Sequence, residues 1–236
     1  MAVVLAAGIV RGFAGFGFSA LTVAGMSLLF SPAQVVPAVF VLEVLASISM
    51  LRSVWRDIDW GWLKPLLIGN AIAIPLGVWM LAAIAEAPLR ATVSLVILIA
   101  AILLLTGLHP PWQDSPALRL GTGLVSGVLN GLAAIGGMAV AVMLFATTIT
   151  GAAARATLVA LFFATDLYCL AWAGWHGLVA PKLLVWAAWL TVPMLIGIWI
   201  GSRHFVKVDE AGFRRGVLCL LASIAALGVI NGVRNQ

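Results

Sequence analysis

The sequence predicts an all-α polytopic membrane protein made of two homologous halves. Three observations lead to this fold class. First, the chain of 236 residues is 64% hydrophobic and only 9% charged, with a mean hydropathy of +1.17, whereas soluble domains carry roughly 25% charged residues. Second, its apolar runs are long and unbroken, which argues against the alternating pattern of a β-barrel. Third, a glycine-rich run at 11–18 has a counterpart at 130–137, which lies 119 residues later.

Eight apolar segments follow one another along the chain. Six are close to the roughly 20 residues that cross a bilayer as one helix; they are residues 34–52, 62–84, 88–107, 152–174, 180–202 and 213–232. The other two, residues 2–30 and 117–149, are too long for one simple span and too short for two. Each carries glycines near its middle, so each is expected to be a broken helix. The first lacks a basic leader and has a mid-chain relative, so it is expected to belong to the mature structure.

The two halves match beyond the glycine runs. Residues 11–47 align with 130–166 without a gap, pairing Gly12 with Gly131 and Gly17 with Gly136. Each half then consists of one broken segment followed by three ordinary spans. The sequence therefore predicts an internal duplication, with a first repeat at 1–110 and a second at 111–236, joined in one integral membrane domain.

The positions of the basic residues predict how the halves are oriented. If both broken segments crossed the membrane, six basic residues would lie on each side, which is unusual because cytoplasmic loops are normally enriched in them. If each broken segment returns to its own side, nine lie on one side and three on the other. The nine are Arg52, Arg56, Lys64, Arg119, Arg155, Arg203, Lys207, Arg214 and Arg215, and the three are Arg90, Lys182 and Arg234. Re-entrant hairpins leave three crossings per half, so the halves are predicted to be inverted, as in many secondary transporters.

Arg11 is the first candidate site residue, because an arginine at membrane depth is costly and by default functional. Its planar fork of donors suits carboxylate, sulfonate or phosphate oxygens. The alternative is that Arg11 reaches the membrane interface from the end of a helix. Asn130 stands at the equivalent position of the second half and is expected either to line the path or to hydrogen-bond between helices.

The helices that return from the two breaks offer a second way to bind an anion. We expect them to start near Phe18 and Met138, where the first amide groups lack intrahelical partners and lie at the positive end of the helix dipole. If both tips meet at the centre, two helix N-termini face one cavity. The alternative is close packing of helices through small residues. The candidate binding residues are Gly15, Gly17, Ser19, Gly136 and Gly137.

Glu43 and Asp166 are the acidic residues well inside the apolar spans. A buried carboxyl group can stay protonated and carry a transported proton. The equally open alternative is a neutral acid that hydrogen-bonds between helices. They lie one turn apart in equivalent helices, because Asp166 aligns with Ser47.

The sequence gives no indication of an enzyme, a metal site or a cofactor. The three histidines fall at segment ends, and no nucleophile and base are spaced as in a serine hydrolase. The net charge of +5 does not indicate nucleic-acid binding, because the basic residues lie at span ends. The expected partners are the lipid bilayer, a small anion and a coupled proton.

The runs GFAGFGFSAL and NGLAAIGG, in a duplicated order of one broken and three ordinary segments, resemble the sulfite exporter TauE/SafE family of the 4-toluene sulfonate uptake permease superfamily. The resemblance covers essentially the whole chain. It implies a multi-pass protein of the bacterial inner membrane that transports sulfur-containing or organic anions such as sulfite or sulfonates. An arginine is missing from the second half, where Asn130 replaces it.

The sequence therefore favours a secondary transporter of small anions that works by alternating access between the two glycine breaks. Two alternatives stay open, an anion channel and a membrane scaffold without transport. A channel would show fluxes without counterflow or saturation, and a scaffold would tolerate Arg11→Ala.

Overall fold

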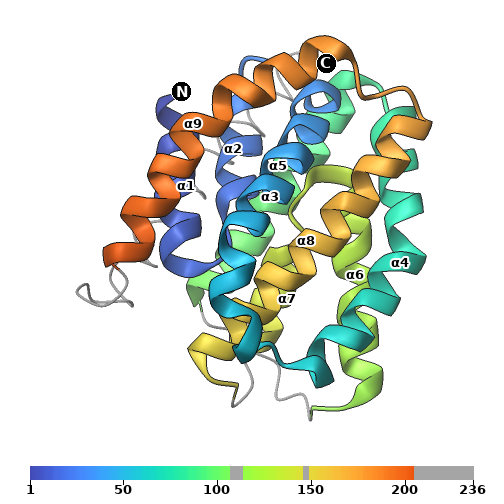
Figure 1. Cartoon of the computed structure of the whole chain (residues 1–236). Coiled ribbons are helices and arrows are strands. Elements are labelled where there is room, and N and C mark those ends of the chain that lie inside the picture. The colour runs from blue at the N-terminus through green and yellow to red at the C-terminus, as the bar shows by residue number, and fades with distance from the viewer. Residues whose placement is uncertain (107–113, 146–148, 205–236) are drawn as a thin grey trace.

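The computed structural model describes residues 1–106, 114–145 and 149–204. Across these ranges all regular secondary structure is helical (Figure 1). The elements in chain order are α1 (Ala2–Ala14), α2 (Phe18–Met26), α3 (Pro32–Val54), η1 (Trp55–Asp57), α4 (Trp60–Ala83), α5 (Glu86–Thr106), α6 (Pro116–Ala133), α7 (Gly136–Phe145), α8 (Gly151–Trp175) and α9 (Pro181–His204).

Five of the six ordinary spans are confirmed as long apolar helices. Helices α3, α4, α5, α8 and α9 are each long and apolar enough to cross a membrane, and their ends lie within two residues of the predicted segments. The last predicted span, residues 213–232, lies outside the described residues. Polar residues fix several helix starts, since the side chains of Asp59, Ser115 and Thr150 accept hydrogen bonds from the first free amides of α4, α6 and α8.

Both long segments are broken where the glycine runs occur. Between α1 and α2, Gly15 (φ 78°) and Gly17 (φ 91°) adopt left-handed backbone conformations, which glycine enters without steric cost. Between α6 and α7 the equivalent of Gly15 is Ala134, whose φ of 57° is also left-handed. A left-handed residue at the equivalent position thus ends the first helix of both broken segments, although Gly136, the equivalent of Gly17, already belongs to α7.

The first broken segment folds back on itself. Gly25, near the end of α2, lies so close to α1 that a Cβ atom there would be 2.9 Å from Cγ1 of Val3, near the start of α1. Helices α1 and α2 therefore form an antiparallel pair, here called the first hairpin. Helices α6 and α7 form the second hairpin, in which Leu118 near the start of α6 and Met143 near the end of α7 line the same groove.

The packing of the helices is reciprocal between the halves. Helix α1 packs along α9 of the second half, and α6 packs along α4 of the first half. Helices α3 and α8 pack against each other at the centre. In addition, α3 contacts α9 of the second half, and α8 contacts α4 of the first half. The two predicted repeats are therefore interleaved in space.

Glycines bring α1 into backbone contact with α9, and α6 into backbone contact with α4. At each of these positions in α1, α9, α6 and α4 a Cβ atom would come within 2.9 Å of the backbone of the facing helix, which leaves no room for a side chain. The positions are Gly8, Gly12, Gly197, Gly201, Gly69, Gly77, Gly123, Gly127 and Gly131. Close packing through small residues, raised as the alternative role for glycine, thus applies to these glycines.

The central helices run in opposite directions. In Figure 1, α3 descends from the upper end of the molecule and α8 ascends from the lower end. The amide of Asp59, just after α3, accordingly donates to Thr157 Oγ1 near the start of α8, over 3.0 Å. Because α1 runs parallel to α9 and α6 runs parallel to α4, the first hairpin enters from the upper end and the second from the lower end.

Candidate functional site

Arg11 lies in the last turn of α1 and is 0% exposed. Its Nη1 donates to the carbonyl oxygen of Gly15 over 2.8 Å, which holds the left-handed turn of the first hairpin. Its Nη2 donates to Ser47 Oγ over 2.9 Å and lies 3.0 Å from Glu43 Oε2. Arg11 does not reach the surface of the protein, because α3 and α8 enclose it.

The Glu43 carboxylate lies at the start of α2. Ser19, the second residue of α2, is beside it, so the carboxylate is close to the positive end of that helix. The hydroxyl and the backbone amide of Ser19 both face the Glu43 carboxylate, whereas Nε of Arg11 has no hydrogen-bond acceptor. Arg11, Ser19 and Glu43, three of the residues selected from the sequence, thus form one buried cluster around an ion pair.

The second half holds an equivalent cluster built from neutral hydrogen bonds. Asn130 Nδ2 donates to Asp166 Oδ1 over 2.7 Å, and Asn130 Oδ1 accepts from the amide of Gly136 over 3.3 Å at the start of α7. Helix α7 therefore begins at Gly136, two residues before the predicted start. Asn130 and Asp166 stand 119 residues after Arg11 and Ser47, so the same contact between equivalent positions recurs in both halves.

Asp166 differs from Glu43 in its partners. It is 1% exposed, and its Oδ2 has no hydrogen-bond partner among the described residues. Within 3.5 Å, Asn130 Nδ2 also approaches Thr165 Oγ1 and Cys169 Sγ. No arginine or lysine forms an ion pair with Asp166 over the ranges the structure covers, although the charges of Glu43 and Arg11 both act on it from the first cluster.

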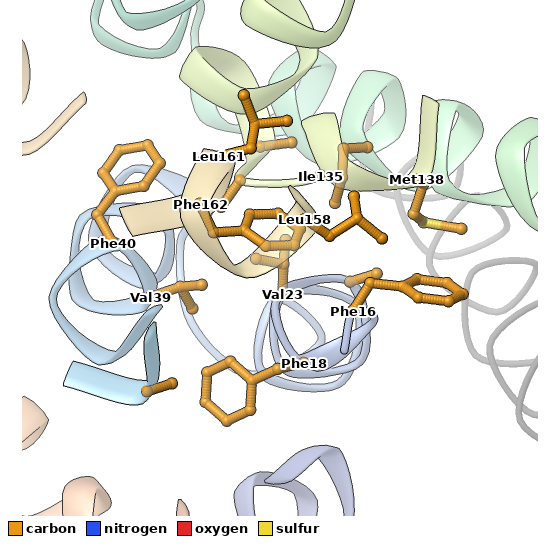
Figure 2. Close-up of a cluster of buried hydrophobic side chains, with 14 of the residues drawn as sticks. Phe16, Phe18, Val23, Val39, Phe40, Ile135, Met138, Leu158, Leu161 and Phe162 are labelled. Carbon is orange, nitrogen blue, oxygen red and sulfur yellow. The ribbon is translucent and has the colours of Figure 1, made fainter. Parts of the chain in front are cut away.

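Phe162 of α8 lies between the two clusters. The centre of its ring is 4.3 Å from Cζ of Arg11, a cation–π contact. On the other side, the ring fills the space beside Gly137, where a Cβ atom would be within 1.9 Å of it. Figure 2 shows Phe162 and Leu158 between Phe16 of the first hairpin and Ile135 and Met138 of the second.

The two hairpin tips lie at different depths along α8. Gly15 packs against Arg155, one turn into α8, while Asn130 contacts Asp166, four turns into the same helix. Since the hairpins enter from opposite ends, their tips pass each other, and an apolar layer separates them. Gly17 is buried beside Val10, and all the candidate glycines are buried.

Two neighbours of Arg11 were not selected from the sequence. Phe162 could have been found because it aligns with Glu43 at the same offset of 119 residues, so these equivalent residues approach Arg11 from α8 and α3. Arg155, counted only as a loop charge, donates from Nη2 to the carbonyl oxygen of Gly12 over 2.8 Å. It places a second cation at the tip of the first hairpin.

Comparison with known protein families identifies the family of this chain. The family model described as Sulfite exporter TauE/SafE matches residues 1–227. The chain belongs to the sulfite exporter TauE/SafE family. This TauE/SafE protein is thus a multi-pass membrane protein of a transporter family, as the glycine motifs and the segment order indicated. No curated protein and no solved structure matched the chain.

Proposed function

We propose that this protein transports a small oxyanion, such as sulfite or a sulfonate, across the bacterial inner membrane. The observation that carries the proposal is the fully buried guanidinium of Arg11 beside the N-terminus of α2. A permanent cation inside an apolar span is energetically costly, and such residues are by default functional. Together with the amides at the start of a helix, this guanidinium makes a binding place for a planar or tetrahedral oxyanion. Gly15, Gly17 and Ser19 would line this place.

The arrangement of the helices supports alternating access. Helices α3 and α8 run in opposite directions, and the contacts of α1 with α9 recur as those of α6 with α4. This is the pattern expected of inverted repeats, whose substrate site lies near the pseudo-twofold axis between them. Arg11 lies between the equivalent residues Glu43 and Phe162, and therefore close to that axis. Among the described basic residues outside this centre, six lie toward the lower end and two toward the upper, so the lower end is assigned to the cytoplasm.

An anion channel and a membrane scaffold fit the structure less well than a transporter does. An open anion channel would need a continuous polar path, whereas apolar side chains, among them Phe162 and Leu158, pack against both hairpin tips. A scaffold would have no use for a buried arginine, since apolar residues of similar volume replace buried ion pairs with little loss of stability. Transport activity rather than catalysis also agrees with the family to which the chain belongs.

A thermal-shift measurement on purified protein tests the anion site. Sulfite, sulfoacetate, taurine, sulfate and phosphate are added separately to the wild type and to the double variant Arg11→Gln/Glu43→Gln, which removes both charges of the pair. We expect at least one anion to raise the melting temperature of the wild type, since a ligand at 100 times its Kd stabilises a protein by about 2.7 kcal/mol. The double variant should show no shift.

The matched control for this measurement is Arg119→Gln, which removes an arginine that is bound to Asp114 at the surface. Its response to the anions should equal that of the wild type. If no anion stabilises the wild type, or if the double variant responds equally, the proposed site is ruled out.

Asp166 is the better candidate for a coupled proton. Glu43 has the counter-ion Arg11, whereas Asp166 is hydrogen-bonded to the amide of Asn130, has a free Oδ2 and feels the like charge of Glu43. An unpaired buried carboxylate is far more costly than a neutral carboxyl group. The binding of Asn130 to Asp166 keeps that group in place beside the second hairpin. We therefore assign the proton to Asp166 and the electrostatic partner of Arg11 to Glu43.

Replacing Asp166 by asparagine tests this assignment. The amide has nearly the same shape and cannot titrate, so we expect normal folding, continued anion exchange, and loss of the acceleration that a pH gradient gives to anion uptake into proteoliposomes. Asp114→Asn is the control, because the hydrogen bonds from Arg119 hold the pKa of Asp114 below its usual value and keep it ionised at neutral pH. Uptake by D166N that still follows the pH gradient would contradict the assignment.

A further inference from the structure

The place best suited to an anion in this molecule is already occupied by a side chain. The Glu43 carboxylate lies 3.0 Å from Nη2 of Arg11 and beside Ser19 at the start of α2, and both partners of the ion pair are at most 1% exposed. These are the two kinds of group, a guanidinium and a helix N-terminus, that would hold a transported oxyanion. Glu43 thus occupies the place of a substrate while remaining attached to α3.

The fit of Glu43 to this place is incomplete. The carboxylate lies against Nη2 of Arg11 and against the hydroxyl and amide of Ser19, but Nε of Arg11 has no acceptor although it is buried. A free oxyanion with three or more oxygens could bind Nε and Nη2 of Arg11 together and also accept from the start of α2. Such a ligand can displace the carboxylate, because it also binds Nε, which Glu43 leaves without an acceptor.

We propose that Glu43 acts as a tethered substitute for the substrate, which neutralises Arg11 whenever the carrier is empty and is displaced when an anion binds. This inference rests on the proposed function, since it concerns the same site. Its consequence concerns the return step of the transport cycle. A carrier that moves anions in one net direction must reorient without substrate, and a lone guanidinium in a dry apolar core opposes any such movement.

Phe162 covers Arg11 with an apolar surface, so water cannot neutralise the guanidinium from that side and an anionic group has to do so. The ring covers one face of the Arg11 guanidinium at 4.3 Å and is itself held against Gly137 of the second hairpin. When the hairpins move relative to each other, Arg11 must pass this ring as a neutral pair, either with the substrate or with Glu43. Asp166 cannot replace Glu43 in this role, because its oxygen is held by Asn130 in the other cluster.

Proteoliposomes loaded with labelled sulfite test the proposal with the variant Glu43→Gln. Two rates are measured, exchange of internal sulfite for external sulfite, and net efflux into medium without a transported anion. We expect exchange to persist in E43Q because sulfite itself neutralises Arg11 in both directions. Net efflux should fall at least about tenfold relative to exchange, which corresponds to about 1.4 kcal/mol on the barrier of the empty return step. Equal reduction of both rates, or no reduction of either, would overturn the proposal.

A thermal-shift measurement with sulfite distinguishes the proposed role of Glu43 from a folding defect in the variant. Without the carboxylate, the empty E43Q protein contains an unpaired buried cation, so sulfite should raise its melting temperature more than that of the wild type. The variant Glu43→Asp keeps the charge but shortens the reach, and its net efflux should fall more than its exchange. An E43D protein in which both rates fall equally, or an E43Q protein that sulfite does not stabilise, contradicts the substitution of Glu43 for substrate.

The double variant Arg11→Gln/Glu43→Gln separates this proposal from the proposed function. If it exchanges sulfite as well as the wild type, Arg11 is not the anion site and the proposed function fails. If it is inactive while E43Q exchanges and effluxes at wild-type rates, the site stands and only the role of Glu43 is wrong.

Discussion

Replacing Arg11 alone by methionine is expected to cost about 3–5 kcal/mol of stability, the range measured when one partner of a buried ion pair is removed. The loss arises because Glu43 is left as an unpaired acid that is 1% exposed, with no other cation in ion-pair contact over the part of the chain that the structure describes. The hydrogen bond from Arg11 to Gly15 is lost at the same time, and with it one restraint on the turn of the first hairpin.

The double variant Arg11→Met/Glu43→Met should recover most of this loss. Apolar residues of similar volume can replace a buried ion pair at little cost in stability, although the protein should no longer bind anions. The measurement is a double-mutant cycle on the free energy of unfolding in detergent, with both single variants. Additive effects of the two substitutions would mean that the ion pair is not coupled in the folded protein.

Gly131→Val is expected to prevent the close approach of α6 and α4. A Cβ atom at residue 131 would lie 2.7 Å from the carbonyl oxygen of Ile74 and from the amide nitrogen of Val78, and neither backbone atom can move without its helix. Overpacking of this kind costs about 1–3 kcal/mol, and more when the backbone has to shift. Since α4 and α6 hold the second hairpin against the first half, we expect a lowered melting temperature and aggregation during purification.

Gly121→Val provides the matched control in the same helix. A Cβ atom at Gly121 meets nothing within 4 Å, so this variant should elute and melt like the wild type. Size-exclusion profiles and melting curves of both variants check the prediction. A G131V protein as stable as G121V would show that the tight contact between α4 and α6 does not hold the fold together.

The candidate site could be predicted from the sequence only as a set of residues. Arg11 and Glu43 were both selected, because charged groups are rare inside apolar spans. Their pairing could not be predicted, because they are 32 residues apart on different helices and because Glu43 had an open alternative as a proton carrier. Phe162 aligns with Glu43 at the offset of 119 residues, but it was missed because an aromatic residue in an apolar helix does not by itself indicate contact with a cation.

The sequence by itself determined the elements that local chemistry controls. The lengths of the apolar runs specify the spans, the glycine runs specify where 2–30 and 117–149 break, and the offset of 119 residues reveals the two halves. Gly15 and Gly17 are residues that can adopt the positive φ found at this break without steric cost. These properties depend on neighbouring residues and on the bilayer, so no distant contact is needed to predict them.

Only the tertiary structure decided which helices meet. The exchange of α1 onto α9 and of α6 onto α4 depends on backbone contacts between glycines that are far apart in the chain. The same packing places the two hairpin tips side by side, brings Glu43 to Arg11 and pairs Asp166 with Asn130. Charge and hydrogen bonding at a buried site depend on groups a few ångströms away in space, and the order of residues along the chain does not specify that neighbourhood.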